Sequence, residues 1–123
     1  MTECIFCQIA TGKIPCYKIY EYKDYLAFLD IFPKTEGHIL VIPKIHIEKV
    51  WDHPEPGKYW ETVTKVAQHL KQVSGEEVRA LVYGFDVPHA HVHLLPGKTD
   101  KFSGQKLSDA ELKEIQSRFL MKS

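Results

Sequence analysis

The sequence has no excess of charge of either sign. Its 16 lysines and arginines balance its 16 aspartates and glutamates, so the formal net charge is zero over 123 residues. Neither sign gathers in a long run, which argues against a basic tract for nucleic acid and against an acidic disordered tail. We therefore expect no nucleic-acid partner.

Long apolar runs and a disulfide framework are also absent. No stretch approaches the roughly 20 apolar residues that cross a bilayer, and Glu3 and Gln8 interrupt the apolar run that a signal peptide needs. The cysteines are Cys4, Cys7 and Cys16, an odd number that argues against disulfide pairing. We expect a cytoplasmic protein with no membrane partner.

The composition is typical of one globular domain over residues 1–123, because 44% of the residues are apolar and 26% are charged. Periodicity and capping signals predict helices over 3–10, 55–74 and 108–120. Alternating apolar segments between turn signals predict strands over 17–22, 25–29, 38–42, 78–83 and 89–95. This order predicts an α+β fold, a five-stranded antiparallel sheet with its helices packed on one face.

The core of that domain should span about residues 3–96, followed by a polar, mobile connector over 97–107 and the final helix. The buried stripe of the main helix is expected at three- and four-residue spacing, at Trp60, Val63, Ala67 and Leu70. Two histidines outside any motif, His53 and His69, are interpreted as surface or helix residues.

Three of the seven histidines alternate in one segment, at His89, His91 and His93. In a strand, side chains alternate between faces, so the three imidazoles are expected on one face. His89 and His93 would lie about 13 Å apart along an extended strand, whereas a zinc–nitrogen bond measures about 2.0–2.1 Å. The spacing therefore suits separate tasks, with metal bound at one end and chemistry in the middle.

Four segments in order resemble the histidine triad (HIT) family. The His89–Pro96 segment is similar to the family signature, in which histidines alternate with apolar residues, and Cys4–Ile9 resembles the opening helix. Ala27–Ile31 and Gly37–Lys44 are similar to two further family segments. The resemblance covers about residues 3–96 and implies the HIT-like fold and a homodimer.

The resemblance implies a nucleotide phosphoramidase or diadenosine polyphosphate hydrolase that acts on purine nucleotides. His91 would attack the α-phosphorus and form a nucleotidyl-histidine that water hydrolyses, which divides one difficult displacement into two steps. His93 would contact the phosphate oxygens, and His38 would support the triad, although it could also be a hydrogen-bonded core histidine. No metal is needed for the chemical step. Phosphoramidates, adenylated amines and dinucleoside polyphosphates are the implied substrates.

The same resemblance implies a nucleoside site. The carboxylate of Asp30 would accept hydrogen bonds from the ribose hydroxyls, unless it serves only as a turn residue. An apolar slot for the base, whose residues could equally be ordinary core, would be lined by Ile5, Phe6, Ile9, Phe28 and Ile31.

The cysteines suggest a second site. Cys4, Cys7, His46 and His89 match the structural zinc ligands of some bacterial family members, and two thiolates with two imidazoles suit tetrahedral zinc. The Cys-x-x-Cys pair could instead be a thioredoxin-like redox pair, or two metal-free thiols packed as small apolar residues. Cys16 has no expected partner.

The segment before the triad departs from the family. Many members have a longer turn there, with an asparagine and a Gly-Gln-Ser or Gly-Gln-Thr run that binds phosphate, whereas this chain has only Tyr83–Pro88 and places Asp86 at the expected serine. A carboxylate beside a phosphate is repulsive, so catalysis is expected to be slower or directed at cationic or neutral leaving groups. Two rival functions stay open: nucleotide binding without catalysis, and a zinc hydrolase with His89 and His91 as ligands.

Overall fold

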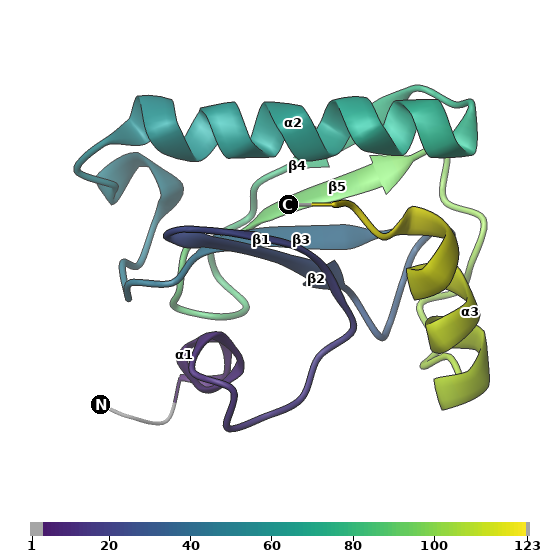
Figure 1. The fold of residues 1–123 in the computed structure, drawn as a ribbon, viewed down its shortest axis with the longest axis horizontal. Coiled ribbons are helices and arrows are strands. Elements are labelled where there is room, and N and C mark those ends of the chain that lie inside the picture. Colours follow the sequence, from purple (N-terminus) through teal and green to yellow (C-terminus); the bar gives the residue numbers. More distant parts are fainter. Residues whose placement is uncertain (1–3, 123) are drawn as a thin grey trace.

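The structure is a computed structural model that describes residues 4–122 (Figure 1). Three α-helices lie within that range, α1 (Ile5–Ala10), α2 (Pro56–Ser74) and α3 (Asp109–Phe119), together with a 3-10 turn, η1 (Val50–Asp52). The described strands are β1 (Lys18–Tyr22), β2 (Tyr25–Leu29), β3 (Ile39–Pro43), β4 (Val78–Leu81) and β5 (Val92–Pro96).

The strands form one antiparallel sheet in the order β1-β2-β3-β5-β4, which confirms the predicted α+β fold. The order brings β5 beside β3, where His93 pairs with Leu40. It also brings β4 to the other side of β5, where His93 pairs with Leu81. The centre of the sheet therefore gathers residues that are far apart in the chain.

Strand β5 begins at Val92, three residues later than predicted. The ladder with β3 ends at the Val41–Val92 pair, because Pro43 has no N–H to donate. The carbonyl oxygen of Pro43 instead accepts a hydrogen bond from Nε2 of His89, at 2.8 Å. His89 and His91 thus lie in the segment that leads into the strand.

Both faces of the sheet are covered (Figure 1). Alternate residues of β2 and β3, such as Ala27 and Val41, face the large core under α2 and α3. Their neighbours Phe28 and Leu40 face a smaller core with Phe6 of α1. The long helices lie on one face as predicted, but the short α1 lies on the other. A strand whose residues are all buried, as in β2 and β3, is typical of a sheet covered on both sides.

Helix α2 begins with Pro56 and ends at Gly75, whose φ of 71° is readily adopted by glycine. Val63 and Leu70 of the predicted stripe are buried, but Trp60 is 39% exposed and its neighbour Tyr59 is fully buried instead. The hydroxyl of Tyr59 donates to the carbonyl oxygen of Val41 at 2.8 Å, which satisfies its polar group inside the core. Neither α2 nor any other helix within residues 4–122 is long and apolar enough to cross a membrane.

The expectation for His53 is also wrong. The side chain is buried rather than exposed, follows η1 outside any helix, and stacks on the ring of Tyr25. Its Nε2 lies 3.1 Å from the hydroxyl oxygen of Tyr25, so a polar partner makes its burial tolerable. His69 does lie in α2, as expected, and its Nε2 contacts the carbonyl oxygen of Phe119 at 2.8 Å.

The connector between β5 and α3 (97–107) contains no helix or strand, but main-chain hydrogen bonds attach it to the loop between β2 and β3. The main-chain N–H groups of Lys101 and Phe102 both donate to the carbonyl oxygen of Lys34, at 2.9 and 3.0 Å. The N–H of Leu107 donates to the carbonyl oxygen of Ile31 at 3.1 Å. The polar composition predicted mobility, whereas these main-chain bonds join the connector to the loop between β2 and β3.

Candidate active site

The histidines of the triad gather on the sheet face that α1 covers. The rings of His89 and His91 both meet Phe6 of α1 edge to face, with centroids 5.9 and 5.1 Å away. The ring of His93 lies 5.1 Å from that of His91. The structure therefore brings the three imidazoles to one face, as their spacing predicts.

His91 has one nitrogen in a defined hydrogen bond and one without a partner. Its Nδ1 lies 2.7 Å from the carbonyl oxygen of His89, and because a carbonyl only accepts, Nδ1 must carry the hydrogen. In the neutral ring Nε2 then holds the lone pair. Nε2 is buried and makes no hydrogen bond within residues 4–122, although Oδ1 of Asp86 lies 3.2 Å away at an unsuitable angle. Nε2 is therefore the ring nitrogen whose lone pair no described side chain or main-chain group uses.

His38, which directly precedes β3, reaches His93 across the sheet. Nε2 of His38 lies 3.0 Å from Nδ1 of His93, and both rings are buried. Burial, with a smaller contribution from the neighbouring imidazole, lowers the pKa of His38 to about 3 and that of His93 to about 4. Both rings are therefore neutral at pH 7.

Asp30 lies at the edge of this histidine pair. One carboxylate oxygen accepts a hydrogen bond from the N–H of Phe32 at 2.8 Å, and the other lies 3.6 Å from Nε2 of His38. Burial raises the pKa of Asp30 above its ordinary value. Its side chain keeps 20% of its surface exposed, so a carboxylate oxygen can meet a ligand beside the histidines.

Four of the five apolar residues expected to line a base slot lie on this face. Phe6 and Phe28 meet edge to face at 5.7 Å, and Ile9 packs against the same cluster. Ile5 lies on α1 with 45% of its surface exposed. Ile31 packs against the larger core on the opposite face, so the structure does not join it to the other four.

The four predicted zinc ligands lie together. Sγ of Cys4 and Sγ of Cys7 lie 3.4 and 3.5 Å from Nδ1 of His89, and Sγ of Cys7 lies 3.2 Å from Nδ1 of His46. With the usual zinc bond lengths, nitrogen and sulfur ligands of one tetrahedral ion lie about 3.5 Å apart. All four ligand atoms lie within 4.8 Å of one another, so the residues present fit one zinc ion.

The protonation of His89 also suits this site. Its Nε2 must donate to the carbonyl oxygen of Pro43, because a carbonyl only accepts, so Nδ1 turns its lone pair toward the two sulfurs. Burial lowers the pKa of His89, which keeps the ring neutral. His89 and His91 therefore point their lone pairs at different places, which does not support a single zinc held by both.

The third cysteine lies apart from this cluster. Cys16 packs against the small core under α1, and burial raises the pKa of its thiol. No other ligand-type side chain within residues 4–122 groups with it.

Two residues that the sequence analysis did not single out stand at the rim of the histidine cluster. The ring of Tyr83 meets His93 edge to face at 5.6 Å, and the ammonium of Lys34 lies 5.4 Å from the Tyr83 ring centre. Because Leu81 pairs with His93, alternation along the chain brings Tyr83 to the same face. That signal depends on the pairing of β4 with β5, which spacing alone does not reveal.

The two buried neutral histidines predict that stability falls in mild acid. The pKa of an unfolded histidine is about 6.5, whereas the folded values of His38 and His93 are about 3 and about 4. Between these values the unfolded chain binds more protons, so the free energy of unfolding rises with pH. At about pH 5 we expect a loss of about 2 kcal/mol for each ring relative to neutral pH, measured by urea unfolding.

The double variant His38→Gln, His93→Gln supplies the control, because glutamine does not titrate. Both proteins are unfolded with the same zinc concentration, since the zinc ligands also bind protons in acid. We expect the variant to lose much less stability between neutral pH and about pH 5. An equal loss in the two proteins would assign the pH dependence to other groups.

Comparisons with known proteins agree with this arrangement. The profile of the HIT domain family matches residues 11–100. Protein hit of Bacillus subtilis is 40% identical over 115 residues, which cover 81% of this chain and 76% of that protein. The adenosine 5′-monophosphoramidase HNT1 of Saccharomyces cerevisiae is 35% identical over 104 residues, which cover 80% of this chain and 65% of that protein.

A solved structure is similar in both fold and sequence. The zinc-bound histidine triad family protein from Mycobacterium smegmatis superimposes with a TM-score of 0.74 at 30% identity. The alignment covers 94% of each chain. The similarity therefore extends beyond the segment that the family profile matches.

Proposed function

This chain belongs to the HIT domain family, and on that basis we propose that it hydrolyses purine nucleoside phosphoramidates at the α-phosphate through a covalent bond to His91. The observation that carries the proposal is the lone pair on Nε2 of His91, fixed by the hydrogen bond from Nδ1 to the carbonyl oxygen of His89. The yeast relative's name, adenosine 5′-monophosphoramidase, supports the same class of substrate.

In the first step, Nε2 attacks the α-phosphorus and the phosphorus–nitrogen bond to the leaving amine breaks. The amine takes the bonding electrons and gains a proton from solvent, and the nucleotidyl group stays on His91. The positive charge on the ring is stabilised by the carbonyl oxygen of His89, which accepts from Nδ1. In the second step, water attacks phosphorus, the bond to Nε2 breaks, and the nucleoside monophosphate leaves.

The same proposal assigns the binding groups. Asp30 accepts from the ribose hydroxyls, and His93 contacts the phosphoryl oxygens. The base lies against the α1 face, lined by Ile5, Phe6, Ile9 and Phe28, whereas Ile31 packs against the opposite core and is not assigned to the base. Zinc on Cys4, Cys7, His46 and His89 would tie α1 to the sheet as a structural ion, and it takes no part in the chemical step. Action on dinucleoside polyphosphates, a homodimer and a cytoplasmic location stay predictions.

A single-turnover assay tests this function. Protein in excess is mixed with adenosine 5′-phosphoramidate, with and without a chelator, and AMP release and adenylyl-protein are followed by chromatography and intact mass. We expect AMP release with a transient adduct. Binding of AMP without turnover would instead favour a nucleotide-binding protein, a candidate that the contact of Asp86 with the nucleophile supports.

Asp86 also predicts selectivity by leaving-group charge. Its carboxylate lies 3.2 Å from Nε2 of His91, where it repels an anionic leaving group and attracts a cationic one. Charges about 4 Å apart near a protein surface interact by several kcal/mol, so we expect at least an about tenfold preference in kcat/KM for an AMP-diamine over an AMP-amino acid phosphoramidate. Asp86→Asn should remove that preference.

Glu61→Gln makes the same change of charge at an exposed position on α2 and serves as the control. The neutral AMP-alkylamine conjugate provides the reference rate for every protein. If Asp86→Asn and Glu61→Gln show the same selectivity as the original chain, Asp86 does not face the leaving group.

A further inference from the structure

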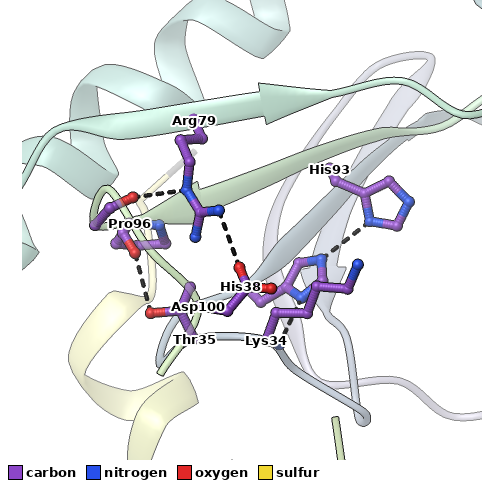
Figure 2. A network of polar contacts seen from close by, with 8 residues as sticks. Lys34, Thr35, His38, Arg79, His93, Pro96 and Asp100 are labelled. Carbon is purple, nitrogen blue, oxygen red and sulfur yellow. Dashed lines mark hydrogen bonds and ion pairs between the residues drawn. The ribbon is translucent and has the colours of Figure 1, made fainter. Parts of the chain in front are cut away.

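The main chain of Lys34 contacts the histidine cluster directly. Its N–H donates to Nδ1 of His38, with the two nitrogens 3.1 Å apart, as Figure 2 shows. A main-chain N–H can only donate, so Nδ1 of His38 must hold a lone pair. Because the buried ring is neutral at pH 7, its single hydrogen lies on Nε2.

The next ring follows from the first. Nε2–H of His38 points to Nδ1 of His93 at 3.0 Å, so Nδ1 of His93 must accept (Figure 2). The hydrogen of neutral His93 therefore lies on Nε2. One main-chain group thus sets the proton positions of two rings in series.

The last group in this chain of hydrogen bonds, the Nε2–H of His93, has no acceptor among the described residues. Nε2 of His93 is buried and has no hydrogen-bond partner within residues 4–122, and the whole side chain is only 8% exposed. A buried N–H without a partner is costly, and this one lies beside His91, whose own Nε2 holds a lone pair. An incoming phosphoryl group satisfies both nitrogens, because its oxygen accepts while its phosphorus receives the lone pair.

We propose that Lys34 is a positioning residue that acts through its main-chain N–H, which orients the protons of His38 and His93 so that His93 offers an N–H donor to the phosphoryl oxygen. This inference rests on the proposed function and names how the phosphate is recognised. The same proton positions favour binding of an anion over binding of a metal ion at these histidines. Two side-chain groups, Asp30–His38–His93 and Asp86–His91–His93, have the residue types of a metal site, but the protons on His38 and His93 leave neither Nε2 free to coordinate.

The connector holds Lys34 in place. The carbonyl oxygen of Lys34 accepts from the N–H groups of Lys101 and Phe102, and the hydroxyl of the next residue, Thr35, donates to the carbonyl oxygen of Pro96 at 3.0 Å. Arg79 braces the connector from β4, through the carbonyl oxygen of Gly97 at 2.8 Å and the carboxylate of Asp100 at 2.9 Å (Figure 2). These bonds fix the peptide that meets His38.

Imidazole ¹⁵N NMR of the full-length protein tests the proton positions without any substitution. We expect Nε2–H on His38 and His93 and Nδ1–H on His91, with the His93 Nε2–H signal moving downfield when AMP is added. Nδ1–H on His38 would overturn the proposal. The expected proton positions together with no AMP release would instead contradict the proposed function.

Two substitutions at one position separate the main chain from the side chain. Lys34→Pro removes the N–H, whereas Lys34→Ala keeps it and removes the ammonium group. Because loss of this bond lets His93 turn a lone pair instead of an N–H toward the anionic phosphoryl oxygen, we expect kcat of Lys34→Pro to fall about 10- to 100-fold, with mixed protonation of His38 and His93 in the NMR spectrum. Lys34→Ala should keep the original proton positions. Equal spectra for the two variants would overturn the proposal, and the spectrum of the unsubstituted protein decides it if Lys34→Pro does not fold.

Discussion

His91→Ala is expected to lower the single-turnover rate of AMP release from adenosine 5′-phosphoramidate by about 10⁴-fold or more, the range seen when a covalent nucleophile is removed. In the proposed mechanism the attacking atom is Nε2 of His91, which holds a lone pair because Nδ1 donates to the carbonyl oxygen of His89. Alanine has no lone pair with which to attack the α-phosphorus. The adenylyl adduct should disappear from the intact-mass spectrum at the same time.

Matched variants show whether this loss is specific to the nucleophile. His93→Ala removes a donor to the phosphoryl oxygen and should cost about 10²- to 10³-fold, while the adduct still forms. His69→Ala changes a histidine on α2, far along the chain from the triad, and should leave the rate within a few fold. An adduct on His91→Ala, or an unchanged rate, would rule out the covalent role of His91.

Removal of Cys4, the N-cap of α1, together with Cys7 in its first turn is the second change with a large expected effect. We expect Cys4→Ser, Cys7→Ser to lose one bound zinc per chain and to melt about 10 °C lower than the zinc-loaded protein. An ion present at about 1,000 times its Kd stabilises the folded state by about 4 kcal/mol, and about 1 kcal/mol moves the melting temperature of a domain this size by a few degrees. Metal analysis and calorimetry measure the two quantities.

The physical basis of this effect is the position of α1. The helix has six residues, too few for stability by itself. Phe6 and Ile9 pack it on the sheet, and the two cysteines join it to His89. Burial and the neighbouring Cys4 thiol raise the pKa of Cys7, so metal binding must displace a proton there.

Cys16→Ser is the matched control, because Cys16 is the third cysteine and lies outside the cluster. It should keep its zinc and lose only the smaller packing contribution of one side chain. If a chelator leaves the melting temperature of the original chain unchanged, or if the double variant still binds zinc, the four residues do not form a structural zinc site.

The spacing of residues predicted some of this site directly. Alternation alone places His89, His91 and His93 on one face, and the structure agrees. The meeting of His38 with His93 depends on β3 lying beside β5, a pairing of segments about 55 positions apart. Spacing carries no information on such pairing, and the expectation for His38 came from the family resemblance.

Other features could not be predicted for physical reasons of their own. The periodicity of α2 placed Val63 and Leu70 in the core correctly, but it did not show that Tyr59, whose hydroxyl donates to Val41, is buried while Trp60 is exposed. His53 is buried because Tyr25 supplies a polar partner from another strand. The role of Lys34 rests on its main-chain N–H, and the identity of a side chain does not reveal the bonds of its backbone.

The docking of the connector has a consequence for how small a working protein can be. The profile of the HIT domain family matches the chain as far as residue 100, while the two N–H groups that donate to the carbonyl oxygen of Lys34 belong to residues 101 and 102. A chain cut at residue 100 would keep every histidine but lose the two bonds to the Lys34 peptide, which in our proposal orients His38 and His93. A transplant of this site to another scaffold would therefore need the tail as far as Leu107, whose N–H also bonds to the loop between β2 and β3.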